Sequence, residues 1–241
     1  MSTKHFWLGG SIAARALACP GSLNFRGDGS GYSAAAARGT ALHTCVVNLL
    51  EGKWWRAEHA VGYVEDGYRV TAKDAKSALL PAWRAAEKWL NGAPAAYEIQ
   101  VKFKSIRQAG GTIDLLTETG SADFKFGSRA VEVKDNAQLQ FYLAAAVERG
   151  VILPRSEYQL AIIQPAVSAK ALVDTVPHRA LIDMTEKLRA AVKNAKSKNP
   201  TISPGDHCTY CPRRQVCPER LSFVPAAFQA ALNRHERNRN A

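Results

Sequence analysis

The chain has 241 residues, enough to bury a sizeable core in one domain with a small appended lobe. Hydrophobic residues make up 46% and charged residues 22%, as in an ordinary soluble globular protein, and no stretch approaches the roughly 20 apolar residues of a membrane-spanning helix. Lysine and arginine number 32 against 21 aspartates and glutamates, giving a net charge of +11 and a pI near 9.6. This excess favours a polyanionic partner, nucleic acid first, although a merely basic soluble protein would carry the same charge.

The start of the chain has a weak likeness to an export leader, because Cys19 ends an Ala-Leu-Ala-Cys run after a charged and apolar stretch. Arg15 and the Gly9-Gly10 pair interrupt the apolar run. We therefore expect a cytoplasmic protein with no membrane partner.

Hydrophobic periodicity and turn signals predict five main helices and five strands. The helices are expected at 11–18, 33–50, 71–90, 137–149 and 180–196. The strands are expected at 97–104, 110–116, 122–126, 158–164 and 171–176. Pro81 should kink the third helix or begin a new segment of it. This order predicts an α/β fold with a mixed central sheet flanked by helices.

The second and third strands form a predicted hairpin that concentrates polar side chains. Side chains alternate across a strand, so Asp123 and Lys125 project to one face while Phe124 and Phe126 project into a core. If Asp114 lies opposite them, two carboxylates about 4 Å apart would repel by roughly 4 kcal/mol at an effective dielectric of about 20. Such a pair indicates a divalent cation, or else a shared proton, with Lys125 beside a reactive water.

The helix at 137–149 places Gln138 and Tyr142 four residues apart on one face, where both could overhang the carboxylates. Gln138 could instead be a capping-box residue reaching back to Asp135, and Tyr142 could be plain core packing. His43 and Glu98 are further candidates for this site. His43 could instead be a helix histidine packed at the margin of the core, and Glu98 could be a solvated glutamate on a strand. Residues 53–56 interleave two tryptophans with Lys53 and Arg56, as in single-strand-binding surfaces, although burial of both rings would explain them equally well.

This pattern resembles the PD-(D/E)XK nuclease superfamily, and within it the RecB-like exonucleases. Their motifs are a Gly-x-x-x-His helix, an Ile-Asp strand end, an Asp-x-Lys strand and a Gln-x-x-x-Tyr helix, which match residues 39–43, 113–114, 123–125 and 138–142. The resemblance implies a restriction-endonuclease-like core in which Asp114, Asp123, His43 and Glu98 hold Mg²⁺ or Mn²⁺. Lys125 would then orient the attacking water, and Gln138 and Tyr142 would position the nucleic-acid backbone.

A rival acidic-x-Lys motif occurs at Glu132 and Lys134, with the same alternation. We prefer Asp123 and Lys125, because their apolar flanks and the following Gly127 are similar to the Asp-Tyr-Lys-Thr-Gly strand of the family.

Three of the five cysteines, Cys208, Cys211 and Cys217, lie within ten positions, a spacing typical of metal-thiolate sites. Cys19 is the natural fourth ligand, because it precedes a proline in a turn. Cys45, by contrast, lies in the middle of a predicted helix in an apolar run, and we expect it to be buried. Nothing indicates the oxidising compartment that disulfides need.

One early and three late cysteines around the nuclease motifs are similar to the arrangement in AddB-type nucleases and in the exonucleases that accompany CRISPR adaptation. That resemblance implies a 4Fe-4S cluster that joins the two ends of the chain. Zinc is the alternative, with His207 as a further possible ligand.

We therefore expect one PD-(D/E)XK nuclease domain at 1–232, with an iron-sulfur lobe formed by about 11–25 and 200–222, and a disordered basic tail at 233–241. The expected activity is Mg²⁺- or Mn²⁺-dependent exonuclease cleavage of DNA with single-stranded or free ends. The resemblance implies phage or bacterial recombination or repair, alongside a single-strand-binding or annealing protein. Two alternatives are an inactive nucleic-acid-binding module of the same fold and a zinc-stapled interaction protein.

Overall fold

The computed structural model describes residues 6–25 and 33–222, and it divides the chain into two compact units. The first, the core unit, comprises residues 1–13 and 29–189. The second, the cysteine unit, comprises residues 14–28 and 190–241 and so draws on both ends of the chain.

The lobe predicted at 11–25 and 200–222 corresponds largely to the cysteine unit. The basic tail predicted at 233–241 lies outside the described residues. Among the described helices, none combines the length and apolarity that crossing a bilayer requires.

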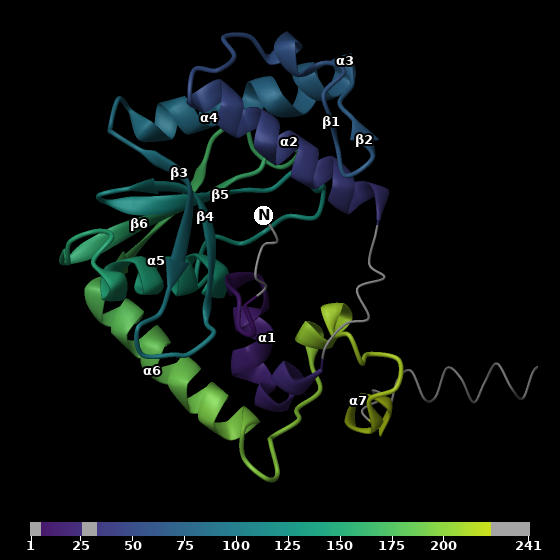
Figure 1. Ribbon diagram of the computed structural model, residues 1–241, viewed down its shortest axis with the longest axis vertical. Coiled ribbons are helices and arrows are strands. Elements are labelled where there is room, and N and C mark those ends of the chain that lie inside the picture. Colours follow the sequence, from purple (N-terminus) through teal and green to yellow (C-terminus); the bar gives the residue numbers. More distant parts are fainter. Residues whose placement is uncertain (1–5, 26–32, 223–241) are drawn as a thin grey trace, which may run out of the picture. The chain divides into compact units, whose positions relative to one another are not determined.

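The core unit is built on a five-stranded mixed sheet whose strands lie side by side in chain order. They are β3 (Ala96–Lys102), β4 (Gly110–Thr117), β5 (Gly120–Phe124), β6 (Glu157–Ile163) and β7 (Leu172–Pro177). Neighbouring strands are antiparallel except β5 and β6, which are parallel. A parallel pair needs a crossover connection, and the helix α5 (Ala137–Arg149) supplies it. The predicted mixed sheet flanked by helices is confirmed (Figure 1).

The other elements that lie wholly in the core unit precede this sheet in the chain. They are η1 (Gly10–Ile12), α2 (Ala34–Leu50), η3 (Ala57–Ala60), β1 (Val64–Glu65), β2 (Tyr68–Arg69), α3 (Ala72–Asp74), η4 (Ala75–Leu79) and α4 (Leu80–Leu90). The cysteine unit contains η2 (Pro20–Asn24), η5 (Asp206–Tyr210) and α7 (Pro218–Ser222), while α1 (Ala13–Ala18) and α6 (His178–Ala195) cross the boundary between units.

Helices cover both faces of the sheet. Figure 1 shows α2 and α4 over one face and α5 against the other. The first face is apolar because Leu115, Phe124 and Ile163 alternate toward the buried side chains of α2 and α4. By the same alternation, Asp114 and Asp123 belong to the opposite face, on the side of α5.

The helix predicted at 71–90 forms as one helical run, α3–η4–α4, which contains Pro81. Thr71 and Asp74 make a capping box at its start. The segment η4 directly before the proline is π-helical, and a wider turn accommodates a residue that has no N–H to donate. The predicted disturbance at Pro81 is therefore a local widening of the helix.

The predicted hairpin forms, with a shift in its second strand. That strand was predicted at 122–126, but β5 begins at Gly120, whose backbone lies so close to Gln159 that a Cβ would be 2.0 Å from its carbonyl oxygen. Pairing with β6 thus fixes the strand start, and only Glu118 and Thr119 remain between β4 and β5. The strand predicted at 97–104 also ends two residues early, because the backbone amide of Lys104 donates to Glu148 instead of to a strand.

Candidate metal centre

The two hairpin aspartates lie opposite each other. Leu115 pairs with Ala122, and the next step of this antiparallel register brings Asp114 beside Asp123 on the same face. The Asp114 side chain accepts a hydrogen bond from the backbone amide of Phe124 at 2.8 Å, which fixes its orientation across the two strands. Both carboxylates are buried, and burial makes their charge costly unless a partner offsets it.

His43, Glu98 and Asp114 form a cluster at this end of the sheet. The Nε2 atom of His43 lies 2.8 Å from a Glu98 oxygen and 3.5 Å from an Asp114 oxygen. One potential ligand atom from each of the three residues lies within 4.8 Å of the others. Glu98 adopts a left-handed backbone conformation, with φ at 52°, in the middle of a strand, and such strain is typical of residues held for function.

The electrostatics of the cluster suit a cation. Burial, and then the charge of Asp123, raise the pKa of Asp114 to about 7. Burial lowers the pKa of His43, but its hydrogen bond to Glu98 and the neighbouring carboxylates outweigh this and raise it to about 8. Carboxylate oxygens with one imidazole form a donor set that fits Mn²⁺ or Mg²⁺.

Asp123, Lys125 and Gln138 form a second group beside the first. The Lys125 ammonium lies 2.8 Å from an Asp123 oxygen and donates to the Gln138 side-chain oxygen at 3.2 Å. The Gln138 amide nitrogen donates to Asp123 at 2.8 Å. Of the four predicted metal ligands, three are therefore clustered, while Asp123 is bound to Lys125 and Gln138.

The capping-box explanation of Gln138 is wrong. Asn136 caps α5 by accepting from the backbone amides of Gln138 and Leu139, which leaves the Gln138 side chain free to reach the carboxylates. Tyr142 follows one turn later on the same helix, and burial, then Asp123 and Asp114, raise its pKa to about 12. Tyr142 is therefore a neutral hydroxyl group whose pKa is raised in part by the charges of both aspartates.

The rival motif lies elsewhere. Glu132 and Lys134 are exposed in the connection between β5 and α5, outside any strand. Buried Gln164 fixes this connection, since its side-chain amide donates to the carbonyls of Gly127 and Arg129 and accepts from the amide of Val131. The alternation of polar and apolar side chains could not by itself distinguish Asp123 and Lys125 from Glu132 and Lys134. It does not show which of the two segments pairs with a neighbouring strand.

A groove of about 820 Å³ opens beside the cluster. One helix face of α2 forms its wall, the end of β5 forms another, and Lys53 and Glu65 lie at its rim. The two tryptophans after Lys53 differ: Trp54 packs partly buried against Tyr63, whereas Trp55 is 73% exposed with its ring edge against His59. Burial therefore explains Trp54 in part, whereas the exposure of Trp55 leaves the single-strand-binding interpretation a prediction.

An ionic clamp that the sequence did not predict joins Arg38 of α2 to Asp74 and to the segment after β5. The Arg38 guanidinium bonds Asp74 at 2.9 Å and donates to the carbonyl of Phe126 at 3.0 Å. Asp74 is buried and also accepts from Tyr68 and Thr71. This clamp joins α2, which carries His43, to the backbone just after Lys125. The one sequence feature that pointed to this clamp was Arg38, a charged residue in an Ala-rich helix.

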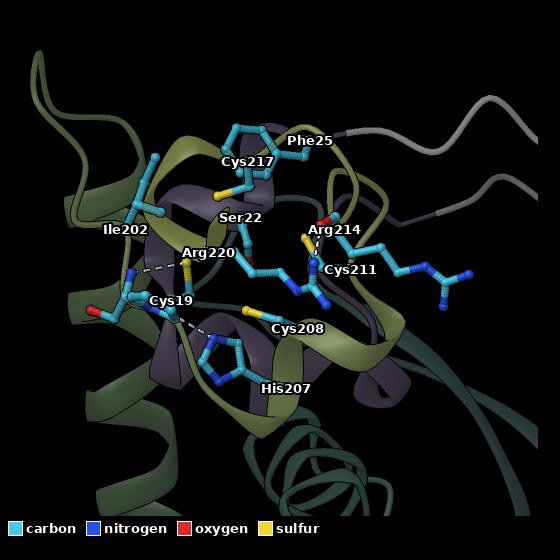
Figure 2. Close-up of a pocket in the computed structure, with 12 residues that line it drawn as sticks. Cys19, Ser22, Phe25, Ile202, His207, Cys208, Cys211, Arg214, Cys217 and Arg220 are labelled. Atoms are coloured by element: carbon cyan, nitrogen blue, oxygen red, sulfur yellow. Dashed lines mark hydrogen bonds between the residues drawn. The ribbon is translucent and has the colours of Figure 1, made fainter. Parts of the chain in front are cut away.

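In the cysteine unit, Cys19, Cys208, Cys211 and Cys217 line a single small cavity together with His207 (Figure 2). Two of the sulfurs already receive N–H groups, Cys19 from the Ser203 amide at 3.4 Å and Cys211 from Arg15 at 4.0 Å. Hydrogen bonds from N–H groups to sulfur are found at metal-thiolate centres. His207 points its Nε2 atom at the carbonyl of Ser203, 2.8 Å away.

Within the described ranges, no three of the cysteine sulfurs come within 4.8 Å of one another. Figure 2 shows the Arg220 side chain running between them, so any bound metal group would have to displace it. Cys45 is fully buried in α2 of the core unit, and burial, then Glu65, raise its pKa to about 12.

The structure thus defines an α/β protein with a carboxylate and imidazole cluster at one end of a mixed sheet and four cysteines gathered in a separate unit. The chain belongs to the family described as Protein of unknown function (DUF2800), which matches residues 5–238. Comparison with curated proteins gives no match.

Among solved structures, the alkaline exonuclease LHK-Exo from Laribacter hongkongensis is similar at 12% identity and a TM-score of 0.39, covering 80% of this chain and 89% of that one. LHK-Exo in complex with dAMP is similar at 10% identity and a TM-score of 0.34, covering 68% and 90%. Resemblances with TM-scores this low assign no function to this chain.

Proposed function

We propose that this chain is a divalent-metal-dependent nuclease that hydrolyses phosphodiester bonds in DNA as an exonuclease of the RecB-like kind. The observation that carries the proposal is the cluster of His43, Glu98 and Asp114 with Lys125 held close by through Asp123. A solvent-accessible groove beside buried acidic groups and an ammonium is the arrangement that phosphodiester hydrolysis needs.

In this proposal, His43, Glu98 and Asp114, with Asp123 next to them, hold Mg²⁺ or Mn²⁺. When bound, the cation lowers the pKa of a water and offsets the charge that develops on the phosphate. Lys125 orients the attacking water and stabilises that charge, and Asp123 and Gln138 hold the ammonium in place. The neutral hydroxyl of Tyr142 donates a hydrogen bond to the DNA backbone.

The substrate in this proposal is a DNA end with single-stranded character. Exposed Trp55 offers a ring on which a base can stack, and Lys53 beside it lines the groove that leads to the cluster. The net charge of +11 supports a polyanionic substrate through counterion release.

The cysteine unit is proposed to hold a 4Fe-4S cluster through Cys19, Cys208, Cys211 and Cys217. Four thiols around one cavity and N–H donors directed at two of them support a metal-thiolate group here. The arrangement of one early and three late cysteines, similar to that of AddB-type nucleases, favours the iron-sulfur cluster over zinc. The proposed role of this cluster is structural, because it would bind residues near both ends of the chain to one inorganic group.

The test of the nuclease proposal is Asp114→Asn compared with Glu132→Gln. Asparagine keeps the shape of Asp114 and can still accept from the Phe124 amide, so the fold should survive. Degradation of end-labelled DNA with Mn²⁺ should fall by more than the about 10–100-fold that loss of an outer-sphere partner costs. Glu132→Gln changes an exposed carboxylate of the rival motif and should cleave like the parent.

Two results would count against the proposal. Full activity of Asp114→Asn would show that the cluster containing Asp114 takes no part in DNA hydrolysis. DNA binding without turnover in either Mg²⁺ or Mn²⁺ would instead identify an inactive binding module of the same fold.

A further inference from the structure

Gly39 occupies a position where glycine is unfavourable. It lies in the interior of α2, six residues into a helix that continues to Leu50. Glycine destabilises a helix interior relative to alanine, because its backbone loses more conformational freedom on folding. A glycine at such a position calls for a reason outside helix formation.

The protein itself supplies no such reason. Gly39 has no positive φ, which would favour glycine. A Cβ added to Gly39 would meet no atom of the described chain within 4 Å, apart from the helix backbone around it. At Gly10 and Gly111, by contrast, an added Cβ would come within 3 Å of the Tyr142 ring, so packing explains those glycines.

The open side of Gly39 faces the groove. Gly39 lines the 820 Å³ groove together with Thr40 and His43. His43 follows four residues later and therefore lies on the same face, about 6 Å further along the helix. The space that a Cβ would fill thus belongs to the groove, one turn away from the candidate metal cluster.

We infer that Gly39 is a substrate-contact residue, where the sugar-phosphate backbone of a bound DNA strand lies directly against the backbone of α2. This rests on the proposed nuclease function and adds the route of the strand. The phosphodiester at the cluster faces His43, and the adjoining nucleotide passes over Gly39. Ala36 and Thr40, which flank Gly39 on the groove wall, are also small enough to permit that approach.

The test is Gly39→Ala, because the fold and the function should respond in opposite directions. The melting temperature should rise by about 2–4 °C, since alanine favours the helix and meets no clash. Cleavage should fall by about 10–100-fold, since a displaced strand is no longer aligned with the cluster. Affinity for a single-stranded oligonucleotide, measured by fluorescence anisotropy in Ca²⁺, should fall while Mn²⁺ binding stays unchanged.

The matched control is Gly9→Ala, where an added Cβ would have only an ordinary contact of 3.7 Å to the Gly110 carbonyl. Cleavage and DNA affinity should be unchanged in it. Parental cleavage and affinity in Gly39→Ala would overturn the inference and leave the nuclease proposal standing, and a lower melting temperature would make Gly39 a structural residue. A parent protein that neither cleaves nor binds DNA would overturn both.

Discussion

Tyr142 shows how single residues set the geometry of the candidate site. Its ring packs closely against both Gly10 and Gly111, and a Cβ at either glycine would come 2.6–2.7 Å from ring atoms. These two close approaches restrict where the ring can lie. The charges of Asp123 and Asp114 help to raise the pKa of its hydroxyl.

Gly111→Ala should therefore disturb both stability and catalysis. The new methyl group would lie 2.7 Å from Cε1 and 3.1 Å from Oη of Tyr142, and overpacking of this kind costs about 1–3 kcal/mol. Urea unfolding measures this cost, and cleavage should fall with it because the hydroxyl is displaced.

A double-mutant cycle with Tyr142→Ala separates this steric mechanism from a general effect of alanine in β4. Once the ring is absent, Gly111→Ala should cost much less than in the parent. An equal cost in both backgrounds would show that the ring does not constrain Gly111.

At the scale of elements, the sequence predicted what depends on local pattern. Alternation in the hairpin correctly separated Asp123 and Lys125 from Phe124 and Phe126, and Phe124 and Phe126 indeed stack together at 6.4 Å. Strand ends were missed where distant groups decide them, as at Gly120. The clamp of Arg38 and Asp74 was missed for the same reason, because it joins residues 36 positions apart.

The clamp of Arg38 and Asp74 should make the free energy of unfolding depend on pH in the acidic range. Burial raises the pKa of Asp74, but hydrogen bonds from Thr71, Tyr68 and Arg38 outweigh it and hold the pKa at about 2, below the usual 3.8. A depressed folded-state pKa stabilises the protein fully above about pH 4, and this stabilisation is lost as the pH falls toward 2. Asp74→Asn should therefore lower the free energy of unfolding at pH 7 by about 2 kcal/mol and flatten its decline between pH 4 and 2.

Tyr68→Phe is the matched control, because it removes one 2.7 Å hydrogen bond to Asp74 and keeps both the charge and the ring. It should cost only about 1 kcal/mol at pH 7 and retain most of the acid-dependent decline. If Asp74→Asn and the parent unfold at the same urea concentration at pH 7, the clamp contributes nothing to stability.

At the scale of the whole molecule, the cysteine unit brings together residues from early and late in the sequence. The backbone amide of Gly21 donates to the carbonyl of Thr201, and the Asn24 side chain donates to the carbonyl of Ala195. Cysteine spacing indicated that Cys19 belongs with the three late cysteines, and all four do line one cavity. The sequence could not predict Arg220 beside the sulfurs, because cysteine spacing does not describe which other side chains line the cavity.

Anaerobic purification of the full chain tests whether the four cysteines bind a metal group and which one. With a 4Fe-4S cluster the protein should be brown and contain about four iron atoms per chain. Cys19→Ser, Cys211→Ser and Cys217→Ser should each lose the iron and lower the melting temperature, because each removes a ligand from a group that joins both chain ends. Cys45→Ser should keep its iron, since that thiol is buried in the core unit. A colourless protein with one zinc ion would select the zinc alternative, and a metal-free parent with unchanged variants would make the four cysteines ordinary packing residues.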